Sequence, residues 1–85
     1  MISDPHRTRQ TTSFIAARPR KRSLTIAGHR TSISLEEAFW DGLKEVAARD
    51  DVSLADLVAR IDTERGTSCG LSSAIRVHVF EQLRR

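Results

Sequence analysis

The chain has 85 residues, of which 39% are hydrophobic, and a formal net charge of +3. A chain this short makes one small domain at most and buries little apolar surface by itself. We therefore expect the chain to be stabilised by obligate dimerisation. No apolar run approaches the roughly 18 residues that a membrane span needs. The lone Cys69 excludes an intrachain disulfide, and we expect a reducing, cytoplasmic environment.

Positive charge is concentrated at the N-terminus. Residues 1–30 carry seven Lys and Arg against one acid, whereas the remaining 55 residues carry seven against ten. Residues 1–21 lack periodicity and contain both prolines, so we expect a disordered basic arm, followed by one domain over residues 22–85. Such an arm points towards a polyanion, with contacts expected from Arg20, Lys21 and Arg22.

Residues 30–35 alternate between polar and apolar, which predicts a strand. Ile33 and Leu35 fall on one face, and the other face carries Arg30, Ser32 and Ser34. A lone strand leaves its backbone groups unpaired, and we expect it to pair with a second copy in an intermolecular two-stranded antiparallel ribbon. A two-stranded ribbon is one of the few shapes that fit the major groove of DNA.

An additional strand is predicted over residues 23–26, which also alternate. Its apolar residues fall on even positions and those of the next strand on odd positions. Because one continuous strand would then change faces, we expect a turn or a bulge at Gly28.

Two helices are predicted after the strands, over residues 36–49 and from Ser53, as N-cap, to Gly66, as C-cap. Ser34 with Glu37 three residues later matches a capping box for the first helix. The apolar side chains of the strand and helices are expected to form the core of a dimer: Ile33, Leu35, Phe39, Trp40, Leu43, Leu57 and Ile61.

A third helix is predicted after the polar loop 67–70, with Ser72 as its cap. Val77 and Phe80 lie off its apolar stripe, and a helix that is apolar on more than one side is usually sandwiched in an interface. Arg76 is expected to pair with Asp62 or Glu64. The predicted fold is therefore mostly α with a short β-ribbon and an extra C-terminal helix.

The order strand, helix, short loop, helix resembles the ribbon-helix-helix family of DNA-binding proteins. Residues 28–32, 39–40 and 71–76 more narrowly resemble a bacterial subfamily of predicted ribbon-helix-helix proteins. This resemblance covers about residues 21–82. It implies an intertwined dimer whose paired strands enter the major groove, with Arg30, Ser32 and Ser34 at the positions that read base edges.

The resemblance also implies a phosphate contact at the N-terminus of the second helix, at Ser53 and Leu54. Residues 71–84 also resemble the family's second helix, but we assign residues 53–65 to it because their distance from the first helix is right. If the later segment is the second helix, the phosphate contact moves to Leu71 and Ser72.

No nucleophile–base pair, phosphate loop or Cys/His ligand spacing appears in the sequence, so we expect neither an enzyme nor a metal or cofactor site. We expect a homodimeric transcriptional regulator that binds double-stranded DNA in the bacterial cytoplasm, at the nucleoid. One alternative is a protein-interaction module, such as the antitoxin of a toxin–antitoxin pair, with a toxin as its further partner. Another is a dimerisation unit without DNA affinity.

Overall fold

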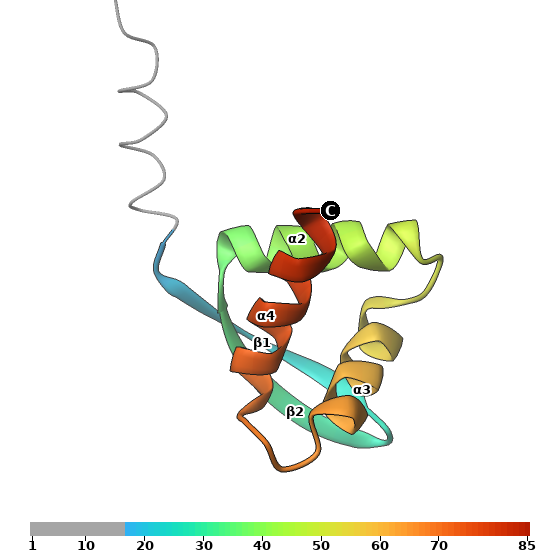
Figure 1. The fold of residues 1–85 in the computed structure, drawn as a ribbon. Helices are drawn as coiled ribbons and strands as arrows, with labels where there is room; N and C mark the ends of the chain where they lie inside the picture. The colour runs from blue at the N-terminus through green and yellow to red at the C-terminus, as the bar shows by residue number, and fades with distance from the viewer. Residues whose placement is uncertain (1–16) are drawn as a thin grey trace, which may run out of the picture.

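The computed structural model describes residues 17–85, which form a two-stranded sheet followed by three helices (Figure 1). The predicted fold class, mostly α with a short β-ribbon and an extra C-terminal helix, is confirmed. The elements are β1 (Pro19–Ile26), β2 (His29–Glu36), α2 (Glu37–Arg49), α3 (Leu54–Arg65) and α4 (Leu71–Leu83). Residues 1–16 of the predicted basic arm lie outside the described residues. The arm was predicted to reach residue 21, but residues 19–21 belong to β1 because they pair with the end of β2.

β1 and β2 form an antiparallel hairpin within one chain. The register pairs Ile26 with His29, so the loop consists of Ala27 (φ 50°) and Gly28 (φ 83°). Positive φ at both central positions defines a type I′ turn, whose twist matches that of paired strands. The additional strand and the turn at Gly28 are thus confirmed.

The expectation that the strand over residues 30–35 has no partner in its own chain was wrong. The two-residue turn folds β1 back along the whole of β2, and Pro19 is paired with Glu36 at the far end. The ribbon of this structure is therefore intramolecular. Because the structure describes a single chain, an intermolecular pairing of strands stays a prediction.

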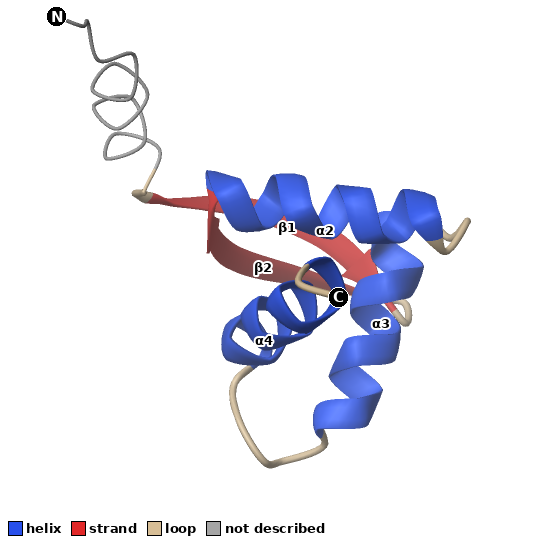
Figure 2. Cartoon of the chain, turned by 45° about the horizontal axis from the view of Figure 1, so that its top comes forward, coloured by secondary structure: helices blue, strands red, loops and turns tan. Residues whose placement is uncertain are grey.

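The three helices cover one face of the ribbon and leave the other face open (Figures 1 and 2). The core lies between the ribbon and the helices, and it includes Leu35, Trp40, Leu43, Leu57 and Ile75, each fully buried. Of the seven residues predicted for a dimer core, six are buried inside this single chain, and Phe39 is partly buried against them. Their role in a dimer stays a prediction.

Two contacts of α2 fix its place. Trp40 Nε1 donates a hydrogen bond of 2.9 Å to the carbonyl oxygen of Arg20, which ties α2 to β1. On the side of α4, a Cβ added at Gly42 would lie 2.6 Å from Val79 Cγ1 and 3.1 Å from Leu83 Cδ1. The two helices therefore approach closely because residue 42 has no side chain.

The helix caps follow the sequence only in part. Ser53 caps α3 as predicted, since its Oγ accepts a hydrogen bond of 3.0 Å from the backbone N of Asp56. The capping box predicted for α2 was wrong, because Ser34 is still part of β2 and the N-cap is Glu36. The cap predicted for α4 was also wrong: the N-cap is Gly70, and the hydroxyl of Ser72 donates instead to the carbonyl oxygen of Ser34, at 3.1 Å.

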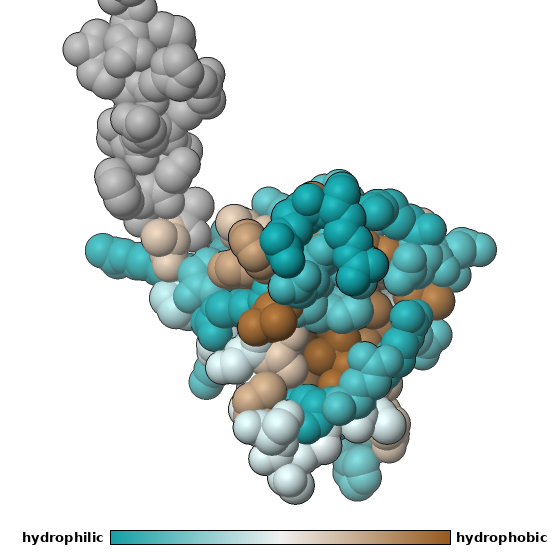
Figure 3. Space-filling view, viewed as in Figure 1, coloured by the Kyte–Doolittle hydropathy of each residue, from teal (hydrophilic) through white to brown (hydrophobic). Residues whose placement is uncertain are grey.

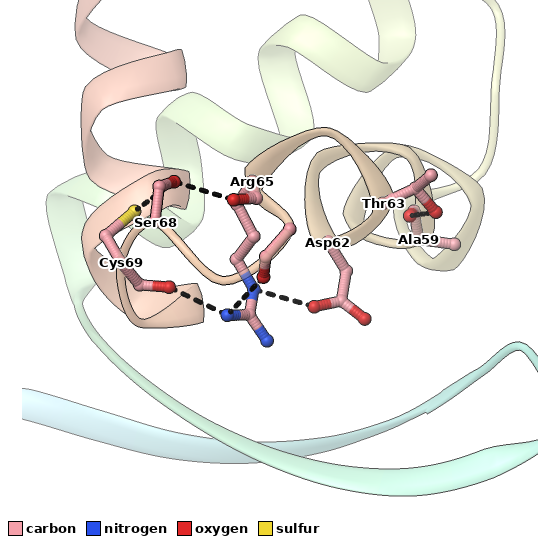
Figure 4. A network of polar contacts seen from close by, with 7 residues as sticks. Ala59, Asp62, Thr63, Arg65, Ser68 and Cys69 are labelled. Carbon is pink, nitrogen blue, oxygen red and sulfur yellow. Dashed lines mark hydrogen bonds and ion pairs between the residues drawn. The ribbon is translucent and has the colours of Figure 1, made fainter.

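Arg65 holds the loop between α3 and α4 in place (Figure 4). Its Nε donates to Asp62 Oδ1 at 2.7 Å, and its Nη1 donates to the carbonyl oxygen of Cys69 at 2.7 Å. Ser68 Oγ in turn donates to the carbonyl oxygen of Arg65 at 2.6 Å. These bonds join the end of α3 to the start of α4, and so they fix where α4 begins.

Candidate nucleic-acid interface

The open face of the ribbon is the surface on which the sequence placed base contacts. Alternate residues of a strand share a face, and the apolar residues of both strands point to the helices. The register brings three cross-strand pairs together on the open face: Lys21 with Ser34, Ser23 with Ser32, and Thr25 with Arg30. Five of these six side chains are exposed, and that of Ser34 is half-buried. We call these six residues the outer ribbon face.

The chemistry of the outer ribbon face suits a polyanion. It carries four hydroxyls between two cations, and no carboxylate among the six residues. Lys21 and Arg30 lie four register steps apart, about 13 Å at ~3.3 Å per residue. Hydroxyls both donate and accept hydrogen bonds, and a guanidinium can bind a guanine edge at two points. The face therefore combines groups for phosphates with groups for base edges.

Arg20 and Arg22, which were predicted to bind DNA together with Lys21, lie on the other side of the ribbon. Arg20 Nη1 is 3.7 Å from Glu37 Oε1, and Arg22 Nη2 is 3.5 Å from Glu37 Oε2. The Arg22 guanidinium also lies 5.1 Å from the centre of the Trp40 ring. One carboxylate thus balances part of the charge of both arginines, and the basic cluster of the sequence is divided between two faces.

A family model described as "Ribbon-helix-helix domain" matches residues 19–83, which include both strands and all three helices. The chain belongs to the ribbon-helix-helix family. This family consists in general of DNA-binding transcription regulators, which are typically not enzymes. The predicted resemblance is therefore confirmed.

A solved structure is similar to this chain over most of its length. It is that of an uncharacterized protein from Bordetella pertussis Tohama I, with 30% sequence identity and a TM-score of 0.69. The match covers 95% of this chain and 69% of the other. No curated protein matches the chain.

The two helix N-termini that the sequence offered for the ribbon-helix-helix phosphate contact differ in the structure. At α3, the backbone N–H of Asp56 already donates its hydrogen bond to Ser53 Oγ, so it is not free for a phosphate. The Asp56 carboxylate also adds negative charge to the first turn. At α4, the N-cap is Gly70 without a side-chain cap, and the first turn has no acid. The positive end of a helix attracts anions, so the α4 terminus is the more suitable of the two.

The N-terminus of α4 also lies at the edge of the ribbon. The Ser72 hydroxyl reaches the carbonyl oxygen of Ser34 in β2, and the Arg76 guanidinium binds Glu36 through both of its oxygens, at 2.8 and 3.1 Å. The hydrogen bond from Arg76 lowers the pKa of the Glu36 carboxyl. The predicted pairing of Arg76 with Asp62 or Glu64 was therefore wrong, and Asp62 pairs with Arg65 instead.

Sequence reasoning missed two residues of the outer ribbon face, Ser23 and Thr25. The signal was present, because the alternation of Leu24 and Ile26 also fixes the direction of the odd-numbered residues in β1. Among residues 17–85, no helix is long and apolar enough to cross a membrane, and no group of three His, Cys, Asp or Glu could hold a metal ion.

Proposed function

We propose that the protein is a homodimeric DNA-binding transcription regulator that inserts the outer ribbon face into the major groove of DNA. The observation that carries this proposal is the composition of that face: two cations, four hydroxyls and no carboxylate, all on the side of the ribbon that the helices leave open. A ribbon of two strands has a width that the major groove admits. We place the protein at the nucleoid of a bacterial cytoplasm.

Within this proposal the residues have different tasks. Arg30 is suited to a bidentate contact with guanine, and Ser32 and Ser34 add hydrogen bonds that discriminate weakly between bases. Lys21 at the other end of the face binds a phosphate, and so sets position more than sequence. Of the predicted set, Arg20 and Arg22 have the weakest support, because Glu37 competes for both.

The phosphate contact at a helix N-terminus is proposed for Leu71 and Ser72, in preference to Ser53 and Leu54. The α4 terminus is uncapped by a side chain and is joined to the edge of β2, where the backbone of a bound duplex would pass. Support for a homodimer comes from the small core of one chain, which has 12 buried hydrophobic residues among residues 17–85. A toxin partner, as in the antitoxin alternative, has no support from the family.

Binding to duplex DNA can be tested by fluorescence anisotropy on genomic fragments, with Arg30→Ala as the test variant. Arg49→Ala is the matched control, since Arg49 is an exposed arginine at the C-terminus of α2. We expect the wild type and the control to bind alike and Arg30→Ala to bind more weakly. If neither wild type nor variant binds any fragment at low salt, the DNA-binding proposal is wrong.

The groove can be tested on a bound fragment by dimethyl sulfate, which methylates guanine N7 in the major groove. We expect bound protein to protect specific guanines, and we expect Arg30→Ala to lose part of this protection. Binding that leaves every guanine N7 reactive would contradict insertion into the major groove.

A further inference from the structure

Glu37 holds two arginines of β1 at the end of the ribbon. It is the first residue of α2, and its two carboxylate oxygens lie 3.7 Å from Arg20 Nη1 and 3.5 Å from Arg22 Nη2. The register pairs Pro19 with Glu36, so the start of β1 lies next to the start of α2. Figure 3, in the view of Figure 1, shows hydrophilic surface along this part of β1. We call Arg20, Arg22 and Glu37 the flank cluster.

The Glu37 carboxylate depends on these arginines to compensate its charge. Its side chain is 32% exposed, and its Oε1 is buried and accepts no hydrogen bond from the described residues. A buried anionic oxygen without a donor is costly, so a nearby cation is stabilised beside it. Because Glu37 lies in the first turn of α2, the positive end of the helix favours its negative charge. Glu37 is therefore a fixed anion that attracts both arginines.

The two ion pairs of the flank cluster are loose. Neither is as short as the roughly 2.7–2.9 Å of a charge-assisted hydrogen bond, and the Arg20 side chain is 65% exposed. Two guanidiniums share one carboxylate, so the cluster keeps a net charge of +1. β1 is also an edge strand, since the sheet has two strands, and a long side chain can turn outward there. Another anion can therefore compete with Glu37 for the arginines.

We propose that Glu37 is a specificity-determining residue, which keeps Arg20 and Arg22 away from polyanions that do not take the ribbon into a groove. The proposal rests on the proposed function, in which the outer ribbon face enters the major groove. The two arginines lie on the opposite side of the ribbon, so a ribbon seated in the groove gains little from them. A polyanion that lies along the helix side of the ribbon would contact both. Specificity is a difference of affinities, and it rises when a competing mode of binding is weakened.

The carboxylate of Glu37 thus acts on the part of the affinity that does not depend on sequence. Contacts to phosphates supply nearly all of non-specific binding, and they carry no sequence information by themselves. Loss of the charge of Glu37 should therefore strengthen binding to DNA of any sequence outside the groove. Each arginine that then contacts a phosphate should steepen the slope of log K against log salt concentration by about 0.9.

Fluorescence anisotropy of Glu37→Gln tests this effect on DNA. Glu45→Gln is the matched control, because it removes the same charge from an exposed position about 12 Å further along α2, at ~1.5 Å per residue. We expect Glu37→Gln to bind a random-sequence duplex more tightly than the control does, with a steeper salt dependence. Its affinity for the genomic fragment that the wild type binds best should rise less, so the ratio of the two affinities should fall. Circular dichroism verifies that both variants fold.

The same substitutions in a background of Arg20→Ala with Arg22→Ala test whether the arginines carry the effect. Without them, Glu37→Gln and Glu45→Gln should bind the random-sequence duplex alike. A gain that persists in this background overturns the proposal, as does a Glu37→Gln variant that binds like the control. An equal gain on the random-sequence duplex and on the best genomic fragment also overturns it, because Glu37 would then limit affinity without affecting specificity.

Heparin chromatography separates this proposal from the proposed function, because heparin is a polyanion that has neither base edges nor a major groove. We expect Glu37→Gln to elute at higher salt than Glu45→Gln, and we expect this difference to vanish in the background without the two arginines. Equal elution of the two single variants overturns the hold of Glu37 on its arginines, even if the wild type binds DNA. A wild type that binds no DNA overturns the proposed function, while the elution difference still decides whether Glu37 keeps the arginines from polyanions.

Discussion

The ribbon and α4 each turn one side to the same core, but their solvent sides differ in chemistry. The outer ribbon face carries Lys21, Arg30 and four hydroxyls, which keep their hydrogen bonds to water until a polar partner replaces it. The outer side of α4 carries Val77, Phe80 and Leu83, which gain free energy when any surface removes them from water. The first surface selects a charged, patterned partner, and the second selects an apolar one.

This difference shows that one small domain can carry two surfaces of opposite chemistry. The core needs only one side of each element, so the second side is free to be either polar or apolar. Changes that disturb the shared core should affect both surfaces, whereas changes on one element should affect only that surface. The following predictions use this separation, in order of decreasing expected effect.

Trp40→Ala should weaken both surfaces, because Trp40 is fully buried between them and binds the carbonyl oxygen of Arg20. We expect the free energy of unfolding to fall by about 3–5 kcal/mol. Trp40→Phe keeps most of the ring and loses the hydrogen bond, so its loss should be smaller and include roughly 1 kcal/mol for that bond. Urea denaturation measures both, and equal losses would contradict the role of the buried ring.

Gly42→Ala should act on the side of α4. The new Cβ would meet Val79 Cγ1 at 2.6 Å, so α4 must shift away from α2, at a cost of about 1–3 kcal/mol. We expect unchanged affinity of the folded protein for DNA, because Gly42 lies on the side away from the outer ribbon face. Gly70→Ala is the control, since an added Cβ there meets nothing within 4 Å. If Gly42→Ala is as stable as this control, the close approach of α2 and α4 is wrong.

Ala27→Asn should act on the ribbon alone. Ala27 has φ 50°, a region that costs most L-residues roughly 1–2 kcal/mol but that Asn tolerates, and Asn followed by Gly is the preferred type I′ pair. We therefore expect a rise in the free energy of unfolding of about 0.5–1 kcal/mol. A lower melting temperature than wild type would contradict the assigned turn.

The Glu36–Arg76 pair, which joins the ribbon to α4, should give the smallest effect, and one that depends on pH. Arg76 holds the pKa of Glu36 below its ordinary value. The pair therefore stabilises the fold above the unfolded pKa of about 4.3, and this contribution is lost as the pH falls through the lower, folded pKa. Glu36→Gln should melt at a lower temperature than wild type at pH 7, and the difference should shrink at pH 3. A difference that is the same at both pH values would count against the pair.

The sequence predicted those features that depend on neighbouring residues. The alternation around Gly28 predicted the turn, and the Ser53 cap requires only a donor three residues away. The sequence did not predict the bond of Ser72 to Ser34 or of Arg76 to Glu36, because these partners are 38 and 40 positions apart. Ser72 was predicted as a cap by the local rule, but the ribbon edge offered its hydroxyl a different acceptor.

The candidate site was also predictable in part. Alternation placed Arg30, Ser32 and Ser34 on the open face, where the structure has them. The basic cluster was treated as part of a disordered arm, and this hid the alternation that separates Lys21 from Arg20 and Arg22. Charge counted along a sequence cannot show that Glu37, on the next element, takes up two of those arginines.

The most direct test of the outer ribbon face is the salt dependence of DNA binding for two double variants. Each phosphate contact contributes about 0.9 to the slope of log K against log salt concentration. Removal of both cations of the face, in Lys21→Ala with Arg30→Ala, should make the slope shallower by about 0.9 per protomer, because Lys21 is the phosphate contact of the two. Arg20→Ala with Arg22→Ala removes the same charge from the side that faces Glu37 and should change the slope much less. Equal changes in both double variants would contradict the outer ribbon face as the DNA-binding surface.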